Sequence, residues 1–167
     1  MQKVYLSQLI VLADKLRAIE PLDIGYSGMV LAELQTGHVD SAKTYLSLLK
    51  KLSDSNACSV CATNYYSFAG LFYKNQGNYR AALPYMIESL NLDIARMKEN
   101  PTINLRTSLA GNYLNIGNTF NSLGEYRNSL QNHLKALQLF EELDNKRGIS
   151  FSYQAVGTDF LMLAQFR

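Results

Sequence analysis

The sequence predicts an all-α fold built from repeated helix pairs, and three observations support this class. The 167 residues contain only three prolines, and the long segments between them are rich in Leu, Ala, Gln, Lys and Glu, which favour helix. Apolar residues recur at three- and four-residue steps, as on one face of a helix, for example at Leu130, Leu134 and Leu137. A pattern of glycine, aromatic and small residues also recurs along the chain, which indicates a repeat.

Each copy of the pattern begins with a marker residue and reaches an expected turn seven residues later. A glycine marker lets the first helix of a pair (helix A) approach the second (helix B), and an aromatic residue three positions on fills the groove. The turn glycine ends helix A because it adopts a left-handed conformation without cost. A small residue then receives side chains from helix A. The copies are Val30, Gly37 and Ala42; Gly70, Tyr73, Gly77 and Ala82; Gly117, Phe120, Gly124 and Ser129; and Gly157, Phe160 and Ala164.

This pattern resembles the tetratricopeptide repeat family over roughly residues 22–167. The resemblance implies a right-handed superhelix of antiparallel helix pairs, a TPR-like α-solenoid. The third copy carries it most specifically, through Tyr113, Ile116, Gly117, Phe120, Leu123, Gly124, Tyr126, Ser129 and Ala136.

The spacing of the copies predicts their lengths. The markers Val30, Gly70, Gly117 and Gly157 are 40, 47 and 40 residues apart, against about 34 for the basic repeat. We expect this surplus to lengthen the helices, with Asn100 as an N-cap and Pro101 at the first helical position. The expected parts are a leading helix in 1–20 (about 3–19), a degenerate first repeat at 21–55, a second at 56–100, a third at 101–146, and the first helix of a truncated fourth at 147–167.

Composition excludes several classes of partner. The net charge is +2 with 18% charged residues, so no clustered basic face for nucleic acid is expected. No segment approaches the ~20 apolar residues that span a membrane, and the N-terminus does not have the form of a signal peptide. We expect a cytoplasmic protein, with a periplasmic sensor arm as the alternative.

No motif predicts catalysis, a metal site or a cofactor, so the chain is not expected to be an enzyme. His133 is expected to be a packed core residue, and Asp159 has no evident carboxylate partner. Cys58 and Cys61 are interpreted as two small buried residues at the start of a helix. Half a zinc site and a redox pair stay open as alternatives, and a periplasmic location would let the two thiols oxidise.

The resemblance also implies a binding surface, because the A helices of this family line a concave face. Such a surface would be rich in amides and hydroxyls, which suit the backbone of an extended or helical peptide. The alternative is that these are solvated helix residues. The implied positions are Asn64, Ser67, Leu71 and Lys74; Leu114, Asn115, Asn118 and Asn121; Phe151, Gln154 and Thr158; and, from the first repeat, Ile24, Ser27, Leu31 and Leu34.

The expected function is a protein- or peptide-binding scaffold, the regulatory or sensory part of a larger signalling protein. A homo-oligomerisation module with no separate ligand is the alternative. Its basis is the last expected helix, whose apolar face has no helix B to cover it before the sequence ends. Self-association would use Phe160, Leu163 and Phe166.

Overall fold

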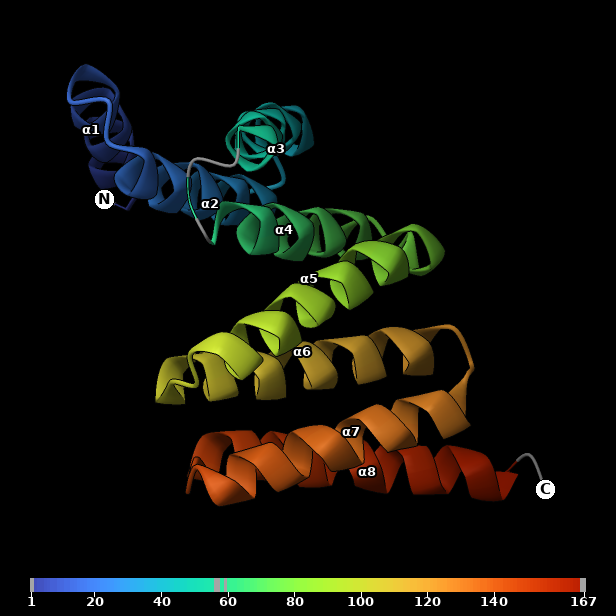
Figure 1. The fold of residues 1–167 in the computed structure, drawn as a ribbon. Helices are drawn as coiled ribbons and strands as arrows, with labels where there is room; N and C mark the ends of the chain where they lie inside the picture. Colours follow the sequence, from blue (N-terminus) through green and yellow to red (C-terminus); the bar gives the residue numbers. More distant parts are fainter. Residues whose placement is uncertain (1, 56–57, 59, 166–167) are drawn as a thin grey trace. The chain divides into compact units, whose positions relative to one another are not determined.

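The computed structural model describes residues 2–55, 58 and 60–165, and the secondary structure found there is entirely helical (Figure 1). The predicted all-α class is therefore confirmed. The chain divides into two compact units, Met1–Asn78 and Tyr79–Arg167. No helix in the described residues is both long enough and apolar enough to cross a membrane.

The first unit contains four helices, α1 (Gln2–Lys15), α2 (Ile19–Gln35), α3 (Val39–Asp54) and α4 (Cys61–Asn75), and α2 packs against the other three. An alanine Cβ at Gly25 or Gly28 of α2 would lie 2.6 Å from Ile10 or 2.7 Å from Leu6 of α1. These two glycines therefore let α1 lie directly on α2. The leading helix ends at Lys15 rather than near residue 19, because Arg17 takes a positive φ of 53°.

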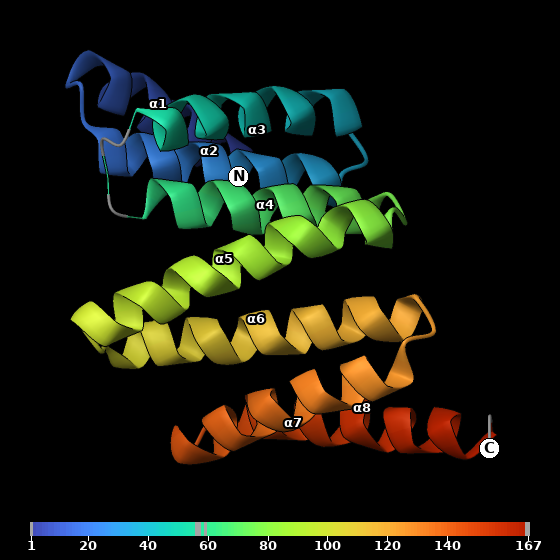
Figure 2. The same cartoon turned by 45° about the vertical axis from the view of Figure 1, so that its right-hand side comes forward.

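The second unit contains α5 (Tyr79–Glu99), α6 (Ile103–Ser122), α7 (Tyr126–Glu142) and α8 (Lys146–Gln165). Consecutive helices pack together, and α6 also contacts α8 (Figure 2). Ala110, Ala136 and Phe140 form a buried cluster between α6 and α7. The expectation of long helices is confirmed, because α5 has 21 residues, α6 has 20, and only residues 100–102 join them.

The turn glycines behave as predicted. Gly37, Gly77 and Gly124 have φ values of 78°, 71° and 77°, the left-handed region in which a side chain is costly. Asp144 makes the equivalent turn between α7 and α8 with a φ of 47°. A short polar side chain is tolerated there, so the turn lacks the glycine by which the others were identified.

The N-cap of α6 lies two residues later than expected. Its N-cap is Thr102, whose hydroxyl oxygen accepts a hydrogen bond from the Leu105 N–H at 3.2 Å. The helix begins at Ile103, so Asn100 and Pro101 both precede it. Thr102 has the extended conformation of an N-cap, and its side chain binds a backbone N–H that the first turn leaves unpaired.

Replacing Thr102 with alanine is expected to lower the free energy of unfolding by about 1 kcal/mol, because the Leu105 N–H loses its acceptor. Urea unfolding followed by circular dichroism measures the change. Thr102→Ser is the control, since it keeps the hydroxyl and should stay close to the parent protein. Equal losses in both variants would contradict the capping role.

Candidate binding site

Three helices of the second unit, α6, α7 and α8, surround a pocket of about 250 Å³. Its lining combines apolar side chains with amides and one hydroxyl. Leu114 packs against the buried cluster of Ala110, Ala136 and Phe140. The lining residues are Leu114, Asn118, Asn121, His133, Phe151, Gln154, Ala155 and Thr158.

Six of these residues were predicted from the sequence, and the structure brings them together around one pocket. The other two are His133 and Ala155. Asn115, another predicted residue, is exposed on α6 but is not among the residues that line this pocket. Four further predicted residues lie half-buried on α4, in the first unit: Asn64, Ser67, Leu71 and Lys74.

Burial changes the role expected of several predicted positions. Asn64 donates a hydrogen bond to the buried Asp23 carboxylate, so its amide is already engaged. Burial lowers the pKa of Lys74 below its usual value. In the first repeat, Ser27 and Leu34 are buried and do not present an open surface, whereas Ile24 is exposed.

A buried hydrogen-bond network lies beside the pocket. Asp159 on α8 is fully buried, and three groups from α6 and α7 surround its carboxylate. His133 Nδ1 lies 2.6 Å from Oδ2, Ser129 Oγ lies 2.7 Å from Oδ1, and Asn121 Nδ2 donates to Oδ1 at 2.9 Å. Ser129 Oγ is also 2.9 Å from the carbonyl oxygen of Gly117. The network therefore joins all three helices of the pocket.

The network leaves one nitrogen of His133 without a partner. A carboxylate only accepts hydrogen bonds, so the proton of the neutral His133 ring is assigned to Nδ1, facing Asp159. Nε2 is then an acceptor, and it is buried with no hydrogen-bond partner among the described residues. A buried acceptor of this kind is costly unless a donor reaches it. One residue that lines the pocket therefore carries an unsatisfied buried acceptor.

These residues do not have the geometry of a nucleophilic triad. In such a triad the serine faces the histidine nitrogen opposite the one that binds the aspartate. Here Ser129 Oγ lies on the Nδ1 side, 3.4 Å from that atom, and bonds to the same aspartate. The arrangement positions the imidazole and gives no activated hydroxyl.

His133 lies in the core as predicted, where it is 1% exposed, but its partner Asp159 was not predicted. The sequence carries only a weak signal for this contact. Ser129 and His133 are four residues apart on one face of α7, and Asp159 follows the marker Gly157 by two residues. The marker Gly117 also has the role predicted for it, because an alanine Cβ there would lie 2.3 Å from His133 Cδ2.

The outer face of α8 is apolar and open. Phe160 is 56% exposed, Leu161 is 67% exposed, and Leu163 is partly exposed. A Cβ at Gly157 would have no described atom within 4 Å. Of the three residues predicted for self-association, Phe160 and Leu163 lie on this helix, and Phe166 lies outside the described residues.

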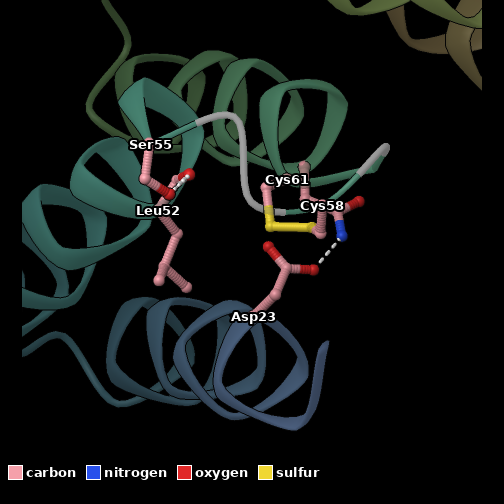
Figure 3. Close-up of a disulfide and its surroundings, with 6 residues drawn as sticks. Asp23, Leu52, Ser55, Cys58 and Cys61 are labelled. Carbon is pink, nitrogen blue, oxygen red and sulfur yellow. Dashed lines mark hydrogen bonds between the residues drawn. A yellow bond between two sulfur atoms is a disulfide. The ribbon is translucent and has the colours of Figure 1, made fainter. Parts of the chain in front are cut away.

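The first unit holds a disulfide between Cys58 and Cys61, at the start of α4. Cys61 is completely buried, as expected, but the expectation of two buried free cysteines is wrong, because the sulfurs are bonded and Cys58 is partly exposed. Figure 3 shows the carboxyl group of Asp23, on α2, directed toward this disulfide. Burial raises the pKa of Asp23 above its usual value. No group of three metal-ligating side chains occurs among the described residues.

Comparisons with known proteins agree with this architecture. A family model for the tetratricopeptide repeat matches residues 63–93, which cover most of α4 and the first part of α5. The crystal structure of BtubC (BKLC) from P. vanneervenii is similar to this chain, with a TM-score of 0.76 over 96% of it and 16% sequence identity. This chain spans 65% of that chain. Curated protein sequences gave no match. The predicted resemblance to the tetratricopeptide repeat family is thereby confirmed.

Proposed function

Because the chain has tetratricopeptide-type helical repeats, we propose that it is a peptide-binding scaffold whose anchoring site is the pocket between α6, α7 and α8. Repeats of this type are typical of protein–protein interaction scaffolds, but a fold alone does not fix a function. The observation that carries the proposal is the pocket itself, which brings predicted surface residues together with His133, whose Nε2 is buried without a partner among the described residues.

The size of the pocket favours part of a longer chain over a whole small molecule. Sites that enclose a drug-sized ligand have volumes of about 300–1,000 Å³, and this one has about 250 Å³. One side chain with some backbone fits that space. Phe151 and Leu114 supply apolar contacts, while Gln154 and Asn118 present amides that both donate to and accept from a peptide backbone.

The chemistry of the pocket selects a donor. No carboxylate, lysine or arginine lines it, so the unpartnered acceptor at His133 Nε2 is the group that we expect a bound peptide to reach. A peptide whose side chain carries an N–H or O–H group would satisfy this nitrogen. In a larger protein, such a site suits a regulatory or sensory arm of a signalling protein.

Phe151→Ala is expected to weaken peptide binding about tenfold or more, because an exposed aromatic at a pocket rim is a typical anchor. An array of random-sequence peptides, followed by fluorescence polarisation on the peptides that bind, provides the measurement. Asn115→Ala is the matched control, since Asn115 lies on α6 outside the pocket lining, and its effect should stay within about twofold. Peptides whose affinity does not change on Phe151→Ala would contradict this site.

The exposed apolar face of α8 favours a second candidate, self-association without a separate ligand. Phe160 and Leu161 lie beside the open Gly157, so another helix can approach closely. Analytical ultracentrifugation over a concentration series tests this candidate. It expects a dimer that Phe160→Asp dissociates, and a chain that stays monomeric at every concentration would exclude it.

A further inference from the structure

The disulfide between Cys58 and Cys61 is poorly explained as a structural cross-link. It joins residues only three apart in the sequence. A disulfide stabilises mainly by restricting the unfolded chain, and a ring this short restricts it less than a long loop would. Cys58 is also partly exposed, and exposed disulfides are typically the labile or catalytic ones.

The two cysteines are not equally exposed. Cys61 is completely buried as the first residue of α4, whereas Cys58 is partly exposed. An external thiolate can therefore reach the Cys58 sulfur, and the Cys61 sulfur becomes the leaving group. A thiolate at the start of a helix is stabilised by the unpaired backbone N–H groups and the helix dipole. This position favours departure of Cys61.

A buried carboxyl group faces the same disulfide. Asp23 is 1% exposed, accepts a hydrogen bond from Asn64 at Oδ2, and has no partner at Oδ1 among the described residues. Figure 3 shows the carboxyl group directed at the disulfide from α2, which packs against α4. Because burial raises the pKa of Asp23, this group keeps a proton where an exposed aspartate has lost it.

We propose that Cys58 and Cys61 form a thiol–disulfide exchange site that reacts with dithiols, and that Asp23 gives a proton to Cys61 as that sulfur leaves. This site lies in the first unit, whereas the pocket lies in the second, so the two proposals stand or fail separately.

The exchange balances without any further reactant. One thiolate of the dithiol attacks the Cys58 sulfur, a new S–S bond forms to it, and the Cys58–Cys61 bond breaks. Cys61 leaves as a thiolate and takes the proton of Asp23. The second thiolate of the dithiol then attacks its partner sulfur in the mixed disulfide and releases Cys58. The dithiol is oxidised by two electrons, the protein disulfide is reduced by two, and Cys58 and Asp23 recover protons from water.

The first test measures the redox equilibrium of the folded protein in mixtures of reduced and oxidised dithiothreitol. Free thiols are trapped with a polyethylene glycol maleimide and resolved by gel shift. The expected result is a reversible passage between disulfide and dithiol while circular dichroism stays helical. A pair that forms no disulfide in excess oxidant, or that is reduced only on unfolding, would overturn the proposal.

The second test assigns the proton to Asp23. Asp23→Asn is expected to slow reduction by dithiothreitol about tenfold or more, because general acid catalysis of this kind contributes at least that much. Ser27→Ala, one turn further along α2, is the matched control and should leave the rate unchanged. An Asp23→Asn rate equal to that of the parent protein would remove Asp23 from the reaction.

A third measurement does not depend on the folding of the Asp23 variant. The single-cysteine proteins made by Cys58→Ser and Cys61→Ser are alkylated with iodoacetamide. The free Cys58 thiol of the Cys61→Ser protein is expected to react about tenfold faster or more, because thiol reactivity follows exposure as well as thiolate content. Equal rates, or the reverse order, would overturn the assignment of Cys58 as the attacked sulfur.

Discussion

Replacing Gly117 with alanine is expected to lower the free energy of unfolding by about 2–3 kcal/mol, the range for overpacking a close contact. The new Cβ would lie 2.3 Å from Cδ2 and 2.5 Å from Nε2 of His133. A flexible side chain could move aside, but this ring is 1% exposed and is held at Nδ1 by Asp159. The helices α6 and α7 must therefore separate. Urea unfolding followed by circular dichroism gives the size of the loss.

Gly157→Ala is the matched control for this prediction. Gly157 occupies the same marker position in the next copy, but it is exposed, and a Cβ there would have no described atom within 4 Å. Alanine should therefore raise stability by about 0.5–1 kcal/mol through its better helix propensity. If Gly117→Ala also stabilises the protein, the close approach of α6 and α7 at this point is wrong.

Much of the fold could be predicted from local rules. A turn glycine such as Gly124 has one strong physical reason for its position, the left-handed backbone, and its φ of 77° bears this out. The small residues Ala42, Ala82 and Ser129 are completely buried where the repeat predicted helix contacts. The extra residues between the second and third markers lengthen α5 and α6, because the three residues 100–102 are enough to join these helices. Each of these inferences uses information within a few residues.

What the sequence did not reveal depends on contacts between distant residues. His133 and Asp159 are 26 residues apart, and neither has a neighbour in the sequence that indicates this buried hydrogen bond. The packing of α1 on Gly25 and Gly28 belongs to no repeat, so periodicity cannot identify it. The disulfide was missed for another reason. Two cysteines at a short spacing fit buried free thiols, half a zinc site or a redox pair, and the spacing alone does not show that the sulfurs are bonded.

The predicted surface amides show why a repeat position does not define a ligand contact. Asn64 and Asn121 both lie on helices whose exposed faces were assigned to binding, yet both donate to buried aspartates. An amide can serve such a carboxylate and still lie at the edge of a surface, because its second polar group remains available. Three buried aspartates accept a hydrogen bond from an asparagine amide in this way. The pairs are Asp23 with Asn64, Asp93 with Asn112, and Asp159 with Asn121.

Asp159→Ala is expected to lower the free energy of unfolding by about 3–5 kcal/mol, because three buried polar groups lose their shared acceptor and each such loss costs about 1–3 kcal/mol. The substitution leaves His133 Nδ1, Ser129 Oγ and Asn121 Nδ2 without their shared acceptor, and it opens a cavity between α7 and α8. Urea unfolding measures the loss. A change below about 1 kcal/mol, the value of an ordinary hydrogen bond, would mean that the network does not hold the three helices together.

Asp159→Asn separates the structural role of the network from its role in binding. Asparagine keeps the volume and an oxygen for Asn121 and Ser129, so the stability loss should be nearer 1 kcal/mol. Its amide N–H then faces His133 Nδ1, which must become the acceptor, and the ring proton moves to Nε2. His133 Nε2 is thereby a donor in place of an acceptor. Peptides selected on the parent protein are expected to bind this variant about tenfold more weakly. Unchanged binding by a folded Asp159→Asn protein would show that Nε2 does not contact the peptide.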